Sequence, residues 1–150
     1  MDQHSVVSLW NQFKVKHPIV KDDYQAWAFG YGKEVADELS DLVIKGIKTA
    51  TASNFALYEV ENEPLPKVGD YSVILDGDGK AVAIIETTRV EICPFDEVTA
   101  AHAFLEGEGD RSLAYWRDVH ETFFKQELEE INQTFHEKIP VVCERFVRVF

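Results

Sequence analysis

The spacing of hydrophobic residues changes twice along this chain, and that change limits the folds it can adopt. Near the N-terminus, Val6, Leu9, Trp10 and Phe13 are three or four residues apart, which is the period of a buried helix face. The middle of the chain is rich in β-branched residues, which favour strands. The spacing becomes helical again before a C-terminal apolar segment. The pattern therefore predicts an α+β fold.

Three helical segments are predicted from this spacing and from the residues at their ends. The first begins at the capping residue Ser5 and ends before Pro18. The second spans residues 32–45, and Gly46 is placed to end it in a left-handed conformation. The third has Asp110 or Ser112 as its N-cap. One face of the third helix is predicted to carry Leu113, Trp116, His120, Phe123 or Phe124, Glu127 and Leu128.

The middle of the chain predicts at least one antiparallel pair of strands. Residues 71–75 and 81–92 flank Asp76-Gly77-Asp78-Gly79, a strong hairpin turn signal. An earlier strand is expected within residues 49–57 and a final one within residues 141–150. We expect the strands to form a small mixed sheet or barrel with helices packed around it. No repeat or linker divides the sequence, so residues 1–150 are predicted to form a single domain.

The charge of the chain argues against a broad nucleic-acid surface. Its 15 Lys and Arg residues face 27 Asp and Glu residues, which gives a formal net charge of −12. Because long nucleic acids are bound chiefly by basic residues that neutralise phosphates, no extended duplex partner is expected. A nucleoside-like molecule or a short RNA stays open as a partner, since a local site can carry its own field against the global sign.

The two cysteines, Cys93 and Cys143, lie in apolar strand-like segments, far from each other in sequence and not beside histidines. This context predicts neither a disulfide framework nor a zinc site, and we expect no metal and no cofactor. No apolar run is long enough to span a bilayer, and no signal segment is recognisable at the N-terminus. A cytoplasmic location without a membrane partner is expected, and the oligomeric state is left open.

The densest candidate chemistry lies in residues 46–53, where a predicted helix end is followed by a lysine and several hydroxyls. A sharp turn at Gly46 would fold Lys48 over the end of the sheet, with Thr51 facing the same space. A desolvated lysine loses its proton more readily and can act as a base toward a hydroxyl. In the alternative interpretation, Lys48 is a solvated loop residue and the threonines are strand formers.

The segment Gly46-x-Lys48-x-x-Thr51-x-Ser53 resembles the signature of the ASCH family, part of the PUA-like β-barrel group. The resemblance covers most of the chain and implies a PUA-like fold with an RNA-associated or nucleoside-processing function. It rests on further segments as well: Ala36-Asp37-Glu38-Leu39, Pro66-x-x-Gly69-Asp70, Glu86-Thr87-Thr88, Pro94-Phe95-x-x-Val98, and Glu106-Gly107-Glu108-Gly109-Asp110 before Trp116 and His120.

Small bacterial members of the family resemble amidohydrolases that remove an acyl group from the exocyclic nitrogen of an acylated cytidine. Their pattern carries over to Lys48, Thr51 and Glu86. In the implied mechanism, uncharged Lys48 takes the proton of Thr51, and the threonine oxygen attacks the amide carbonyl. Glu86 orients the lysine and passes the proton to the leaving amine. The broader signature often has a glutamate at position 51 and an arginine at Ser53, so this chain lacks a phosphate-binding arginine there.

Several other residues are candidates for ligand contact. A nucleoside needs an aromatic face for stacking, which Trp27, Phe29, Tyr31 or Trp116 could supply, although most aromatic residues are expected in the core. Ser53 could add a hydroxyl. His120 is either an acid–base group near neutral pH or a core residue of its helix.

The acidic segment 106–110 has two interpretations. Carboxylates at Glu106, Glu108 and Asp110 would suit a hard cation, but their spacing does not match a calcium loop. The favoured interpretation is a glycine-permitted turn whose acids cap the next helix and hold Lys48 or Arg117. Glu108 and Asp110 are also candidates for ligand binding.

Two function classes follow from these residues. The first is a hydrolase acting on an acylated nucleoside with Lys48, Thr51 and Glu86. The second is a non-catalytic module that binds RNA or a modified nucleoside at the same place, which needs base contacts but no nucleophile. Ribonuclease activity is a third class, made less favourable by the acidic balance and the missing arginine.

Overall fold

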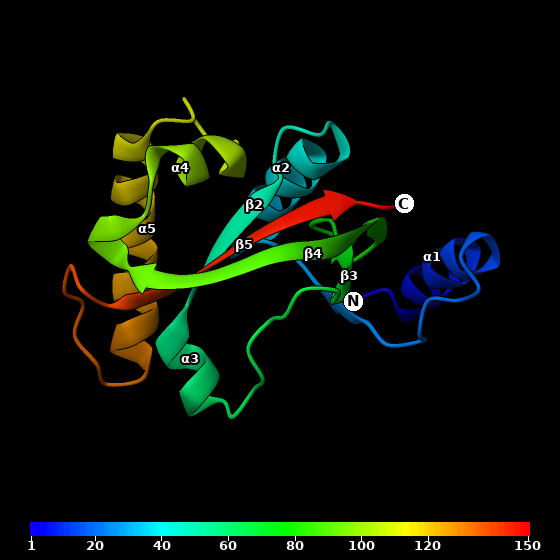
Figure 1. Ribbon diagram of the computed structural model, residues 1–150, viewed down its shortest axis with the longest axis horizontal. Helices are drawn as coiled ribbons and strands as arrows, with labels where there is room; N and C mark the ends of the chain where they lie inside the picture. Colours follow the sequence, from blue (N-terminus) through cyan, green and yellow to red (C-terminus); the bar gives the residue numbers. More distant parts are fainter.

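Five strands form one mixed sheet with the order β1-β3-β4-β5-β2 in the computed structural model, which describes residues 1–150 (Figure 1). The strands are β1 (Gln25–Trp27), β2 (Ala50–Asn54), β3 (Tyr71–Leu75), β4 (Ala81–Pro94) and β5 (Pro140–Arg148). The helices are α1 (Gln3–Lys16), α2 (Lys33–Ile44), α3 (Phe55–Val60), the short 3-10 helix η1 (Phe95–Glu97), α4 (Ala100–Glu106) and α5 (Leu113–Glu130).

The sheet is a curled half-barrel that remains open between its two edge strands. β1 pairs with β3 in parallel, and the other neighbours pair antiparallel. The long strand β4 runs through the middle and pairs with both β3 and β5 (Figure 1). A register shift between Thr87 and Arg89 interrupts the β4–β5 ladder. Such bulges bend a strand and increase its twist, which suits a curled sheet.

The two faces of the sheet are covered by different helices. On the first, which we call the α2 face, strand residues pack against α2 and Phe29. On the other, the opposite face, β3 and β4 pack against α1 at one end, while β5 packs against α4 and α5 at the other. Figure 1 shows α1 and the α4–α5 pair at opposite ends of the sheet, with α3 below β2.

The α+β class and most of the predicted elements are confirmed. The first two helices, the 71–75 and 81–92 strands, their hairpin and the C-terminal strand all form, with ends that differ by a few residues. The third helix buries Trp116, His120, Phe124, Glu127 and Leu128, as its periodicity predicts. Its N-cap is Ser112, whose hydroxyl accepts a hydrogen bond from the backbone N–H of Tyr115 at 3.1 Å.

The strand predicted over residues 49–57 is correct only in its first part. β2 ends at Asn54, because the Asn54 side chain accepts a hydrogen bond from the backbone N–H of Ala56 and starts α3. The short elements β1, α3 and α4 were not predicted; they have three, six and seven residues. No helix in the structure combines the length and hydrophobicity needed to cross a membrane.

Replacing Phe124 with alanine tests the core beneath α5. The Phe124 side chain is fully buried in the cluster that joins α5 to β5 and η1. Phe124→Ala is expected to lower the free energy of unfolding by about 3–5 kcal/mol in urea denaturation. Phe104→Ala on α4, where the ring is 53% exposed, is the matched control and should cost less than about 1 kcal/mol. Equal losses in both variants would contradict this packing.

Candidate functional site

Lys48 lies inside the protein because the chain turns sharply after α2. Gly46 has a φ of +76°, a left-handed conformation that favours glycine. The backbone N–H groups of Ile47 and Lys48 both donate to the carbonyl oxygen of Leu42, at 2.9 and 3.1 Å. This helix ending directs the next residues under α4, and only 1% of Lys48 is exposed. The prediction of a sharp turn at Gly46 is confirmed.

The Lys48 ammonium group is held by oxygen atoms. Its Nζ donates to the carbonyl oxygen of Ala50 at 2.8 Å and to Glu108 Oε2 at 2.9 Å, and it lies 3.4 Å from Glu106 Oε1. It also lies 5.1 Å from the centre of the Phe29 ring, within cation–π range. The favoured prediction for the acidic segment, that its carboxylates hold Lys48, is confirmed. Arg117 instead donates to the carbonyl oxygen of Asp96.

Glu106 is the centre of this cluster. Its Oε2 accepts hydrogen bonds from the indole N–H of Trp116 at 2.6 Å and from His102 Nε2 at 2.7 Å. His120 Nε2 lies 3.6 Å from Oε1. Burial alone would raise the pKa of Glu106. The Lys48 charge, the hydrogen bond from His102 and the charge of His120 together outweigh burial, so the pKa lies well below its ordinary value.

We call this cluster the Glu106 network; its members are Lys48, His102, Glu106, Glu108, Trp116 and His120. It joins the start of β2 to α4 and α5 through buried charges and hydrogen bonds. The Lys48 donors are directed at Ala50, Glu106 and Glu108, and none bonds to Thr51. An uncharged Lys48 would leave two carboxylates without their counter-charge, which is costly in a buried site. The arrangement therefore suits a structural role for Lys48 better than a base.

Thr51 and Glu86, the other two residues of the expected catalytic set, lie on opposite faces of the sheet. Thr51 is directly across the β2–β5 ladder from Glu144, so both side chains point to the α2 face. Glu86 is across the β3–β4 ladder from Tyr71, whose ring packs on Trp10 of α1. Because neighbouring side chains of a strand alternate, Glu86 points away from Thr51. The structure does not bring Lys48, Thr51 and Glu86 together.

The carboxyl group that faces Thr51 is that of Glu144. Ser53 follows Thr51 on the same face, and its hydroxyl lies 2.8 Å from the Tyr58 hydroxyl. Thr87 donates to Glu144 Oε1 at 3.5 Å from the neighbouring strand. We call Thr51, Ser53, Tyr58, Thr87 and Glu144 the polar patch. The Thr51 hydroxyl makes no hydrogen bond within the protein and is half-buried, so it is free to meet a ligand.

Two carboxyl groups near the polar patch titrate close to neutral pH. Burial raises the pKa of Glu144 to about 7, the charge of Asp70 adds to the rise, and the hydrogen bond from Thr87 opposes it. Burial likewise raises the pKa of Glu127 on α5 to about 7, although the hydrogen bond from Tyr31 opposes the rise. Glu144 can therefore be present at pH 7 as either carboxylic acid or carboxylate.

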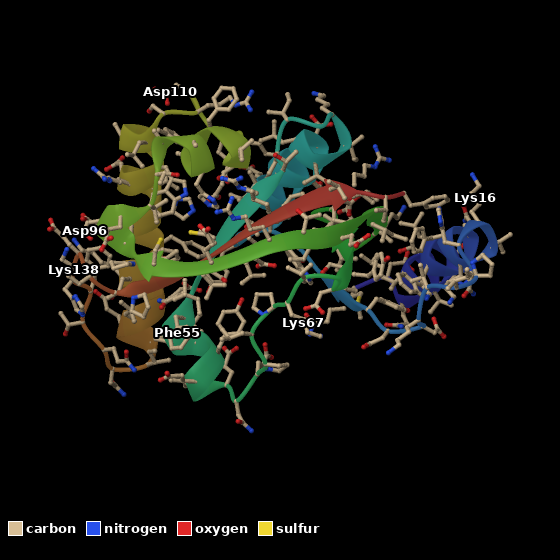
Figure 2. All side chains as sticks on the ribbon, in the orientation of Figure 1. Lys16, Phe55, Lys67, Asp96, Asp110 and Lys138 are labelled. Carbon is tan, nitrogen blue, oxygen red and sulfur yellow. The ribbon has the colours of Figure 1, made fainter.

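The remaining ligand-binding candidates are scattered. Trp116 and His120 are buried members of the Glu106 network, and Phe29 is 4% exposed in the core of the α2 face. Trp27 is half-buried at the end of β1, on the far edge of the sheet from β2. Asp110 lies on the outer side of the α4–α5 connection, where it accepts from the N–H of Ser112 (Figure 2). Only Ser53 lies beside Thr51.

Glu144 and Glu127 are not among the site residues predicted from the sequence. A signal for Glu144 was present, because an acidic residue interrupts the apolar run Val141-Val142-Cys143 and Phe146-Val147 of the final strand. A charged residue within a largely buried strand often has a function. Glu127 was identified only as part of a helix face. No group of three or more His, Cys, Asp or Glu side chains in the structure is arranged to hold a metal ion.

The chain is similar to known proteins both in sequence and in structure. A model of the ASCH domain matches residues 25–149. A crystal structure of an ASCH domain from Lactobacillus crispatus superposes with a TM-score of 0.91 at 32% identity, covering 99% of this chain and 96% of that one. A protein from Enterococcus faecalis superposes with a TM-score of 0.90 at 39% identity, covering 97% of this chain and 88% of that one. The search of curated proteins found no match.

Breaking the Glu106 network should destabilise the fold. Lys48→Met removes the cation and leaves Glu106 and Glu108 without it, which is expected to lower the free energy of unfolding by about 3–5 kcal/mol. Lys45→Met is the matched control, because the exposed Lys45–Asp41 pair contributes less than about 1 kcal/mol. Urea denaturation measures both. Adding Glu106→Gln to Lys48→Met should recover part of the loss, and equal losses at positions 45 and 48 would contradict the network.

The raised pKa of Glu144 predicts a pH dependence of stability. The ordinary pKa of 4.5 applies to the unfolded chain, and the folded value is about 7. The folded state therefore binds the proton more tightly, and this contribution to stability is full below pH 4.5 and lost as the pH rises through 7. Urea denaturation between pH 5 and 8 should show a smaller decline for Glu144→Gln than for wild type. Glu91→Gln, at an exposed position, is the control and should show the same decline in stability as wild type. If Glu144→Gln also shows the wild-type decline, the raised pKa of Glu144 is refuted.

Proposed function

The chain belongs to the ASCH domain family, and from its PUA-like fold and polar patch we propose that it binds a nucleoside-like ligand, with cytosine as the recognised base. The observation that carries this proposal is Glu144, a half-buried carboxyl group with a pKa of about 7, together with Thr51, which lies opposite it and whose hydroxyl makes no hydrogen bond. A free nucleoside and an unpaired base of a short RNA present the same chemistry to this group.

Glu144 in its acid form complements the hydrogen-bonding edge of cytosine. A carboxylic acid has one O–H donor and an acceptor oxygen side by side. Cytosine has an acceptor ring nitrogen, N3, beside the donor amino group on C4. The acid can therefore donate to N3 and accept from the amino group. Uracil presents an N3–H donor beside a carbonyl acceptor, so it needs the carboxyl proton on the other oxygen. The Thr87 hydroxyl donates to Oε1 and so favours the proton on Oε2, which disfavours the uracil arrangement.

The other residues of the polar patch supply contacts of a less selective kind. The hydroxyls of Thr51 and Ser53 lie along β2 beside Glu144, and hydroxyls both donate and accept. Tyr58 is an aromatic residue in direct contact with this row, through the hydrogen bond between its hydroxyl and that of Ser53. Bases bind single-stranded nucleic-acid readers by stacking on such rings as well as by hydrogen bonds. We assign Tyr58 the stacking role expected earlier of Trp27 and Phe29.

The Glu106 network supports this site from behind. Lys48 Nζ bonds to the carbonyl oxygen of Ala50, the peptide that leads into Thr51. The network therefore fixes the start of β2, and with it the position of Thr51 across from Glu144. In this proposal Lys48 is a positioning residue, and Glu86 has no contact with the ligand.

A second function is favoured by one specific observation, the direct opposition of Thr51 and Glu144 on the ladder. A carboxylate with a pKa near 7 is a suitable general base for a hydroxyl in the opposed position of the ladder. Glu144 would take the proton of Thr51, and the threonine oxygen would attack the amide carbonyl of an N4-acylated cytidine. The proton would then pass from Glu144 to the leaving amine, and water would release the acyl group from Thr51. This mechanism keeps the expected nucleophile but replaces Glu86 with Glu144.

Calorimetric titration with cytidine and uridine tests the binding proposal. Cytidine should bind at pH 6 and weaken as the pH rises past 7, because the acid form of Glu144 is lost. Glu144→Leu should weaken cytidine binding about tenfold or more. Glu144→Gln keeps a donor beside an acceptor, so it should retain most of the affinity but lose the pH dependence. Glu86→Leu on the opposite face is the matched control and should bind like wild type.

Several outcomes would overturn the proposal. Equal binding of cytidine and uridine, or the same loss in Glu86→Leu as in Glu144→Leu, would remove Glu144 as the recognising group. Incubation with N4-acetylcytidine decides between the two functions. Release of acetate by wild type, abolished in Thr51→Val and in Glu144→Gln but not in Glu86→Gln, would establish hydrolysis. Binding of cytidine without turnover would leave a recognition module.

A further inference from the structure

A pocket with a volume of about 100 Å³ lies on the opposite face of the sheet, between β4, β5 and the start of α4. Arg89, Arg145, His102 and Thr99 contribute its basic and polar lining. Glu91 and Glu97, also in the lining, contribute acidic groups at exposed positions. The sheet separates this pocket from the polar patch, because Arg145 follows Glu144 in the strand and points to the other side.

Two arginines face each other directly across the β4–β5 ladder in this pocket. Arg89 and Arg145 are paired in the register, so their side chains leave the sheet on the same face. Like charges in directly opposed positions are destabilising. Acidic residues outnumber basic ones in this chain by 27 to 15, so the pairing of two arginines is against the trend of its composition. Such a pair is stabilised when an anion lies between the two groups.

The two arginines differ in how their charge is met within the protein. Arg89 forms an exposed ion pair with Glu91, two residues along its own strand. The Arg145 guanidinium forms no hydrogen bond and no ion pair in the structure, although the residue is half-buried. The other three arginines each donate to a backbone carbonyl oxygen: Arg111 to that of Phe104, Arg117 to that of Asp96 and Arg148 to that of Ile44. Arg145 is therefore the one arginine whose donors are all unused.

We propose that this pocket binds a phosphate group, with Arg145 as the main contact and Arg89 beside it. The planar guanidinium matches phosphate oxygens with two parallel hydrogen bonds, which makes arginine a preferred phosphate ligand. His102 adds a ring whose Nε2 is committed to Glu106 while Nδ1 makes no hydrogen bond. The Thr99 hydroxyl, which caps α4, adds a further polar group at the rim. The site is local, so it does not conflict with the net charge of −12.

This phosphate site stands independently of the proposed nucleoside site. The two lie on opposite faces of the sheet, so the base and the 5′-phosphate of one mononucleotide cannot occupy both. The pocket takes either a terminal phosphate or a phosphodiester of a strand that passes around the sheet. The broader family signature often has an arginine at the position of Ser53, which this chain lacks. In this chain the pocket provides two arginines, Arg89 and Arg145, at a different place in the fold.

Nuclear magnetic resonance titrations at constant ionic strength test the proposal with two probes, inorganic phosphate and two uridines joined by one phosphodiester, because uracil is not the base recognised at the polar patch. Saturable shifts are expected for the backbone amides of residues 89, 99 and 145. Arg145→Gln should weaken binding about tenfold or more, because it removes a charged bidentate contact. Arg111→Gln changes the net charge equally on the α4–α5 connection and should bind like wild type. Arg89→Gln, at an exposed position, provides a second variant should position 145 affect folding.

The outcomes distinguish a terminal phosphate from a phosphodiester as the ligand, and they show when the proposal fails. Saturation by inorganic phosphate alone would support a terminal phosphate, and saturation by the dinucleotide would support a strand backbone. Shifts that grow linearly with both probes, without saturation, would overturn the site. An equal loss of affinity in Arg111→Gln and Arg145→Gln would overturn it too, because the effect would then be one of overall charge. The proposal of cytidine binding at the polar patch does not depend on either result.

Discussion

The buried carboxylate of Glu106 is the charge on which the arrangement of the functional region depends. It accepts hydrogen bonds from Trp116 and His102, and it lies close to the side-chain nitrogens of Lys48 and His120. Its donors come from α4, α5 and the start of β2, so one group connects three elements that are distant in sequence. A buried carboxylate requires such partners, since charge is costly to remove from water. The need to satisfy Glu106 therefore sets where β2 begins.

Strand alternation then divides the chemistry of the sheet between its faces. Thr51 and Glu144 meet on the α2 face because they are opposed in the β2–β5 ladder. Arg145, the next residue, points to the opposite face and meets Arg89. One pair of neighbouring residues in β5 thus serves a carboxyl site on one side and a basic pocket on the other. The sheet keeps these groups apart, so Glu144, whose pKa is raised, coexists with an arginine that has no ion pair.

Much of the fold followed from the sequence, because periodicity and turn residues are local signals. The hairpin at residues 76–79 and the buried face of α5 depend only on near neighbours. Which side chains of different strands share a face of the sheet is harder to predict. It depends on strand register and on bulges, which no short segment encodes. Glu86 was therefore assigned to a site on the wrong side of its strand, and Glu144 was overlooked. Lys48 is buried beside the turn at Gly46 as predicted, and its oxygen partners favour our proposal of a positioning role over a base.

The central claim is that ligand recognition belongs to the Thr51–Glu144 pair and that Lys48 supports it from the interior. A crystal structure of the protein with bound cytidine tests this most directly. The account predicts the cytosine edge against the Glu144 carboxyl group, with Thr51 in contact and Lys48 still bonded to Ala50, Glu106 and Glu108. A ligand bonded to Lys48 Nζ, with Glu106 or Glu108 displaced from it, would contradict the account.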